Sequence, residues 1–519
     1  MRHQRILALA AVFLFSALPP VLGQVKTSIE SLTSSGDQAD LGGFTNPYGP
    51  LISADLRMLA FDSMSSNLVP GDTNDDWDVF VRDRVTHTVT RVSVTSQGGE
   101  SHTYSHVLAM SGDGKSVTFL ARASFPDPSS PLKAVFLHDL TNGSTIRISD
   151  DHGSTGDGTG TMSFDGRYVA FWSSSSQLVP GDTNGSEDVF VFDRVLGTMT
   201  RVSLDSSGAE AKGASFGAFI SLDGRFVAFS SAAKNLVPND TNACSDVFVH
   251  DLQTGETTRV SVSSSGEQGN DTSTAVSISA DGRYVSFESN ASNFWPGDDH
   301  GNDVFVHDRV TGETKLASIS SSGELGNDES YFGSLSGDGR YVAFWSQASN
   351  LVPGDTDGGL DVFVHDLKTG QTQCASVDLA GAPAGGGRGS MSADGRYVVF
   401  DSFSSNVVHN DTNGASDVFM RGAPLRLEAD PDVVTAGDTL TLTTTFGEPD
   451  NPTTLWVTSI NGLPTFLLVI KGNFDPTGTW TIAGTVPSGL GASTIVFRSI
   501  ALGAPGQIVS SNDETVVFQ

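Results

Sequence analysis

Short apolar runs alternate with polar turns along most of the chain, and the alternation itself repeats. The stretch 162–194 reads MSFDGRYVAFWSSSSQLVPGDTNGSEDVFVFDR and defines the repeating unit. Seven copies are each marked by one aspartate: Asp55, Asp113, Asp165, Asp223, Asp281, Asp338 and Asp394. Successive copies lie 52 to 58 residues apart. A near-constant spacing of this size indicates one supersecondary unit repeated along the chain.

Each copy predicts four short β-strands. In the fifth copy these strands fall at 274–279, 283–288, 303–307 and 314–319. An Asp-Gly pair separates the first two strands, and both residue types tolerate the positive φ that a tight hairpin turn requires. The connections are too short for a crossover helix, so the four strands are predicted to form an antiparallel meander.

The second and third strands are apolar at consecutive positions, as at 341–344 and 362–364. A sheet with one exposed face would alternate between apolar and polar residues, so both faces of each sheet are predicted to be covered. Four-stranded sheets that cover one another around an axis form a β-propeller. The competing architecture is a linear solenoid, and signs of ring closure argue against it.

Ring closure is predicted from the two ends of the repeat region. The seventh copy ends after its third strand at 417–421, where the composition changes. The segment 27–36 resembles a fourth strand with its exit loop when it is compared with 258–266. We therefore predict that this N-terminal segment supplies the outer strand of the last blade and removes the open end of the ring. The rival is that residues 425–429 complete the blade instead.

The motif SxDGRYVAF followed by DVFVHD resembles the WD40-like repeat of bacterial TolB-type propellers, the PD40 repeat. The resemblance covers residues 24–421 and all seven copies. It implies an all-β fold with a seven-bladed β-propeller. Propellers of this type serve as binding platforms, as assembly partners and occasionally as enzyme domains, so the resemblance does not select one function.

The C-terminal region, residues 424–519, has no repeat. Gly and Pro separate its strand candidates, which predict a small β-sandwich. The candidates are 425–428, 440–445, 455–460, 479–484, 494–499 and 515–518. The segment 474–487 resembles the C-terminal β-sandwich modules of exported bacterial proteins.

Residues 1–23 are predicted to be a secretory signal peptide. Arg2 and Arg5 lie in a basic start, an apolar core follows at 6–18, and cleavage is expected near Gly23. The apolar core is too short to span a bilayer, and no other segment is long enough. We therefore expect an exported protein without a membrane span, in the periplasm, on the cell surface or outside the cell.

The charge of the chain limits its partners. Lys and Arg number 29 against 60 Asp and Glu, which gives a formal net charge of −31. Such a chain repels nucleic acid and attracts cations, so we expect no nucleic-acid partner. The scattered acids also keep a β-rich surface soluble.

The loop between the second and third strands repeats oxygen-bearing side chains at positions i, i+2 and i+6. The residues are Asp72, Asn74, Asp78, Asp182, Asn184, Asp188, Asp240, Asn242, Asp246, Asp355, Asp357, Asp361, Asp411, Asn413 and Asp417. Such ligands could bind Ca²⁺, although the bidentate Glu of an EF-hand loop is absent. The alternative is that Asp and Asn hydrogen-bond their own backbone and hold a turn. The second copy lacks the motif, and the fifth, at 298–303, is one residue shorter.

In a meander, the loops from second to third strand and from fourth to next first strand lie on one side, which we name the long-loop face. The other side carries only tight turns. We interpret the chain as a non-catalytic binding or scaffold protein that recognises a protein, a peptide or a glycan on this face. The alternatives are an enzyme that uses the propeller channel, a lyase or a glycoside hydrolase, and a calcium-stabilised structural module.

Three motifs resemble catalytic groups. Four histidines precede Asp at the ends of third strands, one per blade, and we expect them to pack there: His138, His250, His307 and His365. His102 and His106 lie near the inner strand of the second blade, where we also expect a structural role. The segment 213–217 matches GxSxG but has no following helix, so a nucleophile elbow is not expected. We assign no catalytic residue.

Overall fold

The computed structural model describes residues 27–41, 43, 51–100, 104–122, 125, 133–149, 160–298, 301–356 and 358–422, and the backbone of the strands beyond residue 425. The predicted signal peptide, residues 1–23, lies outside the described residues. Contacts divide the chain into two compact units, one of which is Lys26–Ala423. The strands that follow Pro424 belong to the other unit. Within the described residues, no helix is long and apolar enough to cross a bilayer.

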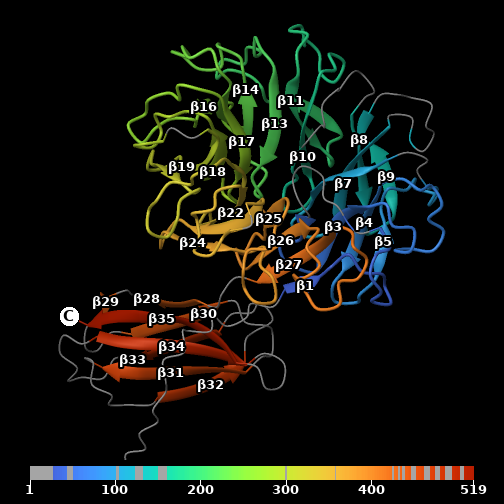
Figure 1. The fold of residues 1–519 in the computed structure, drawn as a ribbon. Helices are drawn as coiled ribbons and strands as arrows, with labels where there is room; N and C mark the ends of the chain where they lie inside the picture. Colours follow the sequence, from blue (N-terminus) through green and yellow to red (C-terminus); the bar gives the residue numbers. More distant parts are fainter. Residues whose placement is uncertain are drawn as a thin grey trace, which may run out of the picture. The chain divides into compact units, whose positions relative to one another are not determined.

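The described strands of Lys26–Ala423 form seven antiparallel sheets, which are the blades of a β-propeller (Figure 1). Blade 1 contains β2 (Leu51–Ile52), β3 (Met58–Ser63), β4 (Asp78–Asp83) and β5 (Val89–Arg91). Blade 2 contains β6 (His106–Met110), β7 (Ser116–Arg122), β8 (Lys133–Asp139) and β9 (Ser144–Arg147). Blade 3 contains β10 (Tyr168–Ser173), β11 (Asp188–Asp193) and β12 (Thr198–Arg201). The predicted seven-bladed all-β fold is therefore confirmed, and the linear solenoid is wrong.

The remaining four blades complete the ring. Blade 4 contains β13 (Ser215–Ile220), β14 (Phe226–Ser231), β15 (Asp246–Asp251) and β16 (Thr257–Arg259). Blade 5 contains β17 (Ser273–Ile278), β18 (Tyr284–Ser289), β19 (Asp303–Asp308) and β20 (Thr314–Leu316). Blade 6 contains β21 (Ser330–Leu335), β22 (Tyr341–Ser346), β23 (Asp361–Asp366) and β24 (Gln371–Cys374). Blade 7 contains β25 (Gly389–Met391), β26 (Tyr397–Ser402), β27 (Asp417–Gly422) and β1 (Thr27–Ile29).

The blades are held together by phenylalanines at one register of the second and third strands. In blade 4, Phe229 lies opposite Phe248, and their ring centroids are 5.8 Å apart. The fully buried set recurs around the ring: Phe61, Phe80, Phe119, Phe171, Phe190, Phe229, Phe248, Phe287, Phe305, Phe344, Phe363 and Phe400. Burying such large side chains contributes strongly to the stability of the core.

The Asp-Gly turn between first and second strands is fixed by a serine and an arginine. In blade 4, Asp223 Oδ1 accepts hydrogen bonds from Ser221 Oγ at 2.5 Å and from the Arg225 amide at 3.0 Å. Gly224 has a φ of +75°, a conformation that side-chain-bearing residues rarely adopt. The Arg225 guanidinium then donates to Asp251 at 3.0 and 2.7 Å. This ion pair explains why an aspartate recurs at the end of the third strand.

The strand-end histidines pack as predicted. His250 Nδ1 is 2.8 Å from Thr257 Oγ1, and Thr257 Oγ1 donates to the backbone carbonyl of Leu204 in the preceding blade. Burial lowers the pKa of His250, so the ring is neutral at pH 7. His138, His307 and His365 make the same contact with Thr145, Thr314 and Thr372. These residues therefore join neighbouring blades.

Backbone hydrogen bonds link the tight turns of successive blades on the face opposite the long loops. The donor and acceptor pairs include Ala54 to Gly112, Asp113 to Phe164, Phe164 to Leu222, Asp223 to Ala280, Ala280 to Gly337 and Gly337 to Ala393. Because each bond joins two blades, this end of the propeller is bound together by main chain.

The N-terminal strand supplies the outer strand of the last blade. β1 pairs antiparallel with β27, with Ser28 opposite Met420. Ser31 Oγ donates to Asp417 Oδ1 at 2.5 Å and accepts from the Val418 amide at 3.1 Å. In other blades the corresponding serine makes the same two contacts with residues of its own repeat. Ser261 of blade 4, for example, contacts Asp246 and Val247. The rival segment lies elsewhere, because β28 (Arg426–Asp430) pairs with β30 (Thr439–Thr445).

The strands beyond residue 425 form two sheets. The first has the order β28-β30-β33, and the second has the order β29-β35-β34-β31-β32. Their bounds are β29 (Val433–Val434), β31 (Pro452–Ile460), β32 (Leu468–Asn473), β33 (Trp480–Thr485), β34 (Thr494–Leu502) and β35 (Ile508–Phe518). Each predicted strand has an observed counterpart, while β29 and β32 are strands that the sequence pattern did not indicate.

Candidate binding site on the long-loop face

Asparagine holds the turn in the repeated acidic loops. In blade 3, Asn184 Oδ1 accepts from the Ser186 amide at 2.8 Å, and Asn184 Nδ2 donates to Asp188 Oδ2 at 2.9 Å. Asn74, Asn242 and Asn413 make the corresponding contacts in blades 1, 4 and 7. An asparagine that bonds its own loop in this way forms an Asx turn. The Asn side chains predicted as metal ligands are therefore engaged within the loop.

An arginine of the fourth strand lies between the loop carboxylates of blade 1. Arg91 Nη1 is 3.1 Å from Asp72 Oδ1, 3.3 Å from Asp78 Oδ2 and 2.7 Å from Glu100 Oε1. In blade 3, Arg201 lies 3.3, 3.4 and 3.0 Å from the matching oxygens of Asp182, Asp188 and Glu210. Burial and then Asp78 raise the pKa of Asp72 to about 6 despite the arginine. The guanidinium is the cation of each cluster.

Blade 4 varies this arrangement. Arg259 Nη1 is 3.3 Å from Asp246 Oδ2 and 3.9 Å from Asp240 Oδ1. Gln268 replaces the glutamate, and its Nε2 donates to Asp240 Oδ1 at 2.9 Å and to Asp246 Oδ2 at 2.8 Å. In blade 7, Gln38 bridges Asp411 and Asp417 in the same way, each at 2.8 Å. Both aspartates of each loop therefore receive donors from the protein.

In blades 1, 3 and 4 an arginine of the fourth strand lies among the carboxylates that the sequence predicts as calcium ligands. Asp72, Asp78 and Glu100 form a cluster whose ligand oxygens lie within 4.8 Å of one another. Arg91 donates hydrogen bonds to Asp78 and Glu100 of this cluster. A calcium ion takes six to eight oxygen ligands around one centre. A divalent cation that bound there would have to displace the guanidinium, because the two positive charges repel each other at contact distance.

The arginine position changes in blades 5 and 6. Leu316 occupies it in blade 5, opposite Phe305 in the register, and Cys374 occupies it in blade 6, opposite Phe363. Burial and the neighbouring Asp298 raise the pKa of Asp303 to about 7 in blade 5. Without a guanidinium, one buried carboxyl of the pair thus retains a proton near neutral pH.

Blade 6 carries the remaining predicted metal ligands. Asp361 Oδ1 accepts from Ser376 Oγ at 2.7 Å and from the Gly385 amide at 3.1 Å. Asp355 is 8% exposed and belongs to the same loop. Asp357, the third predicted ligand, lies outside the described residues.

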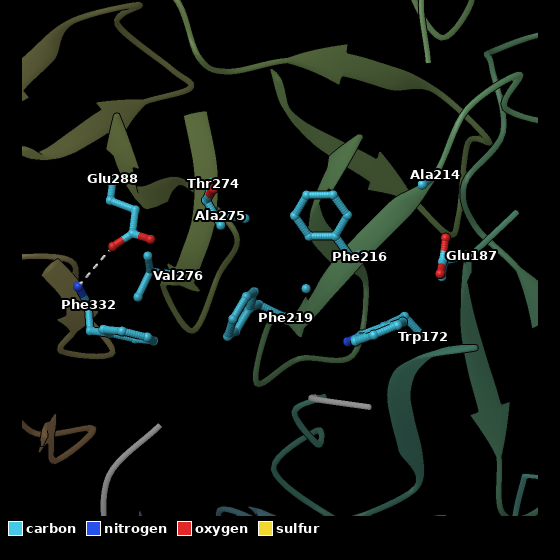
Figure 2. A pocket seen from close by; sticks show the side chains of 11 residues that line it. Trp172, Glu187, Ala214, Phe216, Phe219, Thr274, Ala275, Val276, Glu288 and Phe332 are labelled. Carbon is cyan, nitrogen blue, oxygen red and sulfur yellow. Dashed lines mark hydrogen bonds between the residues drawn. The ribbon is translucent and has the colours of Figure 1, made fainter. Parts of the chain in front are cut away.

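An aromatic pocket of about 450 Å³ is lined by residues of blades 3 to 6, including the first strands of blades 4, 5 and 6. We define it by six side chains: Trp172, Glu187, Phe216, Phe219, Glu288 and Phe332. Figure 2 shows the rings around the cavity and the carboxylates of Glu288 and Glu187 at opposite ends. Its volume falls within the range of ordinary small-ligand pockets.

The lining residues place the aromatic pocket on the long-loop face. Trp172 and Glu288 lie near the ends of second strands β10 and β18, and Glu187 directly precedes third strand β11. Phe216 lies at the start of first strand β13. All four positions are at the strand ends that join the long loops. The loops and the pocket therefore share one face of the propeller.

Phe332 is held in a strained conformation. Its φ of 52° lies in the left-handed region, which a phenylalanine rarely adopts. The equivalent residue of β13 is Gly217, with a φ of +65°. The Phe332 ring stacks on Trp345 with centroids 5.4 Å apart, and its amide donates to Glu288 Oε2 at 3.3 Å. Strain of this kind persists where surrounding contacts over-determine it, which is common in binding sites.

The two pocket carboxylates differ in their surroundings. Burial raises the pKa of Glu288, while its bonds to the Phe332 amide and the Asn302 side chain favour the charged form. The Glu187 carboxylate makes no hydrogen bond or ion pair with any residue that the structure describes. The pocket thus offers hydrogen-bond acceptors at both ends.

The other candidate catalytic groups have structural contacts. His106 Nδ1 is 3.1 Å from Asp62 Oδ2, and the Val107 amide donates to Asp62 Oδ1 at 2.7 Å. This aspartate therefore ties the inner strand of blade 2 to blade 1. Ser215 of the GxSxG segment is buried and 2.8 Å from Ser231 Oγ. His102 lies outside the described residues.

The fold and its faces define the chain as a seven-bladed β-propeller with one elaborated face. Comparison with protein-family models and with curated protein sequences finds no match. Among solved structures, a protein assigned as TolB from Agrobacterium tumefaciens is 14% identical, with a TM-score of 0.36, over 67% of this chain and 98% of that chain. A chain of the mitotic checkpoint complex is 14% identical, with a TM-score of 0.41, over 80% and 98%. The periplasmic gluconolactonase of Pseudomonas aeruginosa is 14% identical, with a TM-score of 0.32, over 85% and 94%. These likenesses assign neither a family nor a function.

Sequence reasoning did not identify the arginines or the aromatic pocket. The arginines left a signal, because Thr-Arg-Val-Ser recurs at 90–93, 200–203 and 258–261 in register with the acidic loops. The pocket left none, because the repeat does not preserve its residues. Three of its rings, Phe216, Phe219 and Phe332, come from the first strands β13 and β21.

Proposed function

We propose that this propeller is a non-catalytic binding protein that recognises a protein, a peptide or a glycan on its long-loop face. The observation that carries the proposal is the aromatic pocket at the strand ends of that face. The opposite face consists of tight turns linked by main-chain hydrogen bonds. Elaborated loops on a rigid scaffold are where propellers and similar folds bind their ligands.

Charge reversal on the long-loop face tests this proposal. Asp271 and Asp328 are exposed in the exit loops before β17 and β21, so a double change to lysine is expected to weaken ligand binding at least tenfold. Ligands are selected with the full chain from a displayed peptide library and a glycan array. Affinities are then measured by calorimetry.

A matched control carries the same charge change on the other face. Glu256 and Glu313 are exposed in the tight turns between third and fourth strands. Changing both to lysine should leave affinity within twofold. Selected ligands that respond equally to the two double variants would contradict a site on the long-loop face.

We further propose that calcium binds the loop of blade 6, through Asp355, Asp361 and Asp357. This proposal is supported by Cys374, which replaces the arginine that lies among the carboxylates in blades 1, 3 and 4. A chelator is expected to lower the Tm of the full chain by a few degrees, because an ion that binds only the folded state stabilises it. Asp355→Asn should abolish the response, whereas an unchanged Tm in chelator would rule the site out.

We infer from residues 1–23 that the protein is exported. We also infer that the two sheets beyond residue 425 pack as a β-sandwich, since each sheet needs a partner to bury one face. The sandwich would display or tether the propeller.

A further inference from the structure

We propose that the aromatic pocket takes a lysine or arginine side chain of a protein ligand. This inference rests on the proposed function and names the chemistry that the long-loop face recognises. It is carried by four aromatic rings, two carboxylates and the absence of any cationic residue among the described side chains that line the pocket.

Aromatic rings attract cations through the negative potential of their faces. An ammonium or guanidinium group over a ring within about 6 Å is stabilised by roughly 0.5 to 2 kcal/mol, most strongly by tryptophan. Trp172, Phe216, Phe219 and Phe332 surround one cavity in Figure 2. The chain itself uses the same chemistry elsewhere, since the Arg225 guanidinium lies 4.6 Å from the Phe226 ring centroid.

The polar groups of the pocket suit a positively charged hydrogen-bond donor. Glu187 and Glu288 accept hydrogen bonds when ionised and donate none. Lysine and arginine only donate hydrogen bonds and carry the opposite charge, so they match such a lining, whereas a sugar hydroxyl can donate to it but brings no charge. A net charge of −31 adds long-range attraction for a basic ligand.

The pocket is preorganised for its ligand. Phe332 is fixed by the Trp345 stack and by the bond from its amide to Glu288, so the ring loses little freedom on binding. The same carboxylate thus positions one ring and faces the incoming cation. A cation that pairs with Glu288 also offsets the cost of its burial.

The test uses the full chain and neutral-ended pentapeptides with a central arginine, lysine or glutamine. Calorimetry is expected to detect the arginine and lysine peptides in the millimolar range, and the glutamine peptide should bind at least fivefold more weakly. Trp172→Leu and Glu187→Gln should each weaken the arginine peptide about fivefold, which corresponds to 1 kcal/mol. Glu267→Gln, an exposed long-loop carboxylate outside the pocket, is the matched control and should change affinity less than twofold.

Several outcomes would overturn the inference. Equal binding of the arginine and glutamine peptides would remove the need for charge. Tighter binding of free choline would show that the pocket serves a small organic cation, and tighter binding of a neutral hexasaccharide would show that it serves a glycan. An unchanged Tm of the variants, measured in parallel, keeps loss of binding separate from loss of folding.

The inference and the proposed function fail in different ways. Library ligands that lose affinity with the double lysine change at Asp271 and Asp328, but not with Trp172→Leu, would leave the binding face intact and reject the pocket. Arginine-peptide binding that needs Trp172, without any library ligand sensitive to the face variants, would support the pocket's chemistry and reject a wider binding face.

Discussion

Deletion of residues 24–36 is expected to destabilise the propeller by more than about 5 kcal/mol. The deletion removes the ladder between β1 and β27 and the contacts of Ser31 with Asp417 and Val418. Each net hydrogen bond contributes about 1 kcal/mol, and a bond to a charged group contributes about 1.5 to 3 kcal/mol. Blade 7 would also gain an unpaired edge, which favours aggregation.

Charge adds to the cost of losing this seam. Glu30 is 5% exposed and lies 3.7 Å from Arg82 Nε and 3.3 Å from Arg84 Nε, so it joins the N-terminal segment to blade 1. Removing one partner of a buried pair leaves the other charge uncompensated. Such a removal costs about 3 to 5 kcal/mol. Glu30→Gln alone is expected to cost about 3 kcal/mol, because Arg82 also donates to the carbonyls of Leu32 and Thr33.

Urea unfolding followed by circular dichroism measures both effects. A synthetic peptide of residues 27–41, added to the deletion variant, should restore part of the lost stability if the strand acts by occupying the edge of β27. An unchanged midpoint after deletion would show that the N-terminal strand does not close the ring.

Arg201→Leu is expected to destabilise the chain by about 3 to 5 kcal/mol at pH 8. The change leaves Asp182 and Asp188, whose side chains are 3% and 0% exposed, without their cation. Leucine itself fits the position, because Leu316 occupies it in blade 5 and is 3% exposed. The loss therefore comes from charge and not from shape.

The effect should shrink as the pH falls. Burial raises the pKa of Asp188 even though the Arg201 charge lowers it. Removing Arg201 is therefore expected to raise the pKa of Asp188 further. A carboxyl with a raised pKa in the folded state binds a proton that the unfolded chain releases, so stability rises as pH falls below the folded pKa. Blade 5 illustrates the end point, where the pKa of Asp303 is about 7. The variant should thus be closer to the parent at pH 5 than at pH 8.

Blade 2 supplies the matched control. Arg147 lies at the same register position opposite Phe136, but Ala134 replaces the aspartate that begins the third strand in other blades. Arg147 is exposed, and Arg147→Leu should cost less than Arg201→Leu, because Ala134 stands where the other loops have a buried aspartate that would lose its cation. The double change Arg201→Leu with Asp182→Asn should recover part of the loss. Equal effects of Arg201→Leu and Arg147→Leu would contradict the role assigned to the ion cluster.

The amino-acid sequence by itself determined the propeller. The near-constant spacing of the seven copies indicated one repeated unit. The Asp-Gly turns and the consecutive apolar positions follow from local geometry, so they could be recognised in a single copy such as 281–288. The N-terminal strand was also predictable, because 27–36 repeats the pattern of a fourth strand. The Asx turns of the long loops follow from Asn and Asp for the same local reason.

Only the tertiary structure decided what surrounds those loops. The acidic residues of the loop alone predict metal ligands. The fold brings Arg201 of the next strand and Glu210 of its exit loop into the same cluster. The aromatic pocket depends on residues of four blades, from Trp172 to Phe332, and no repeat or spacing links them. A sequence pattern shows local periodicity. A site between blades joins residues that are far apart in the chain, and only folding brings them together.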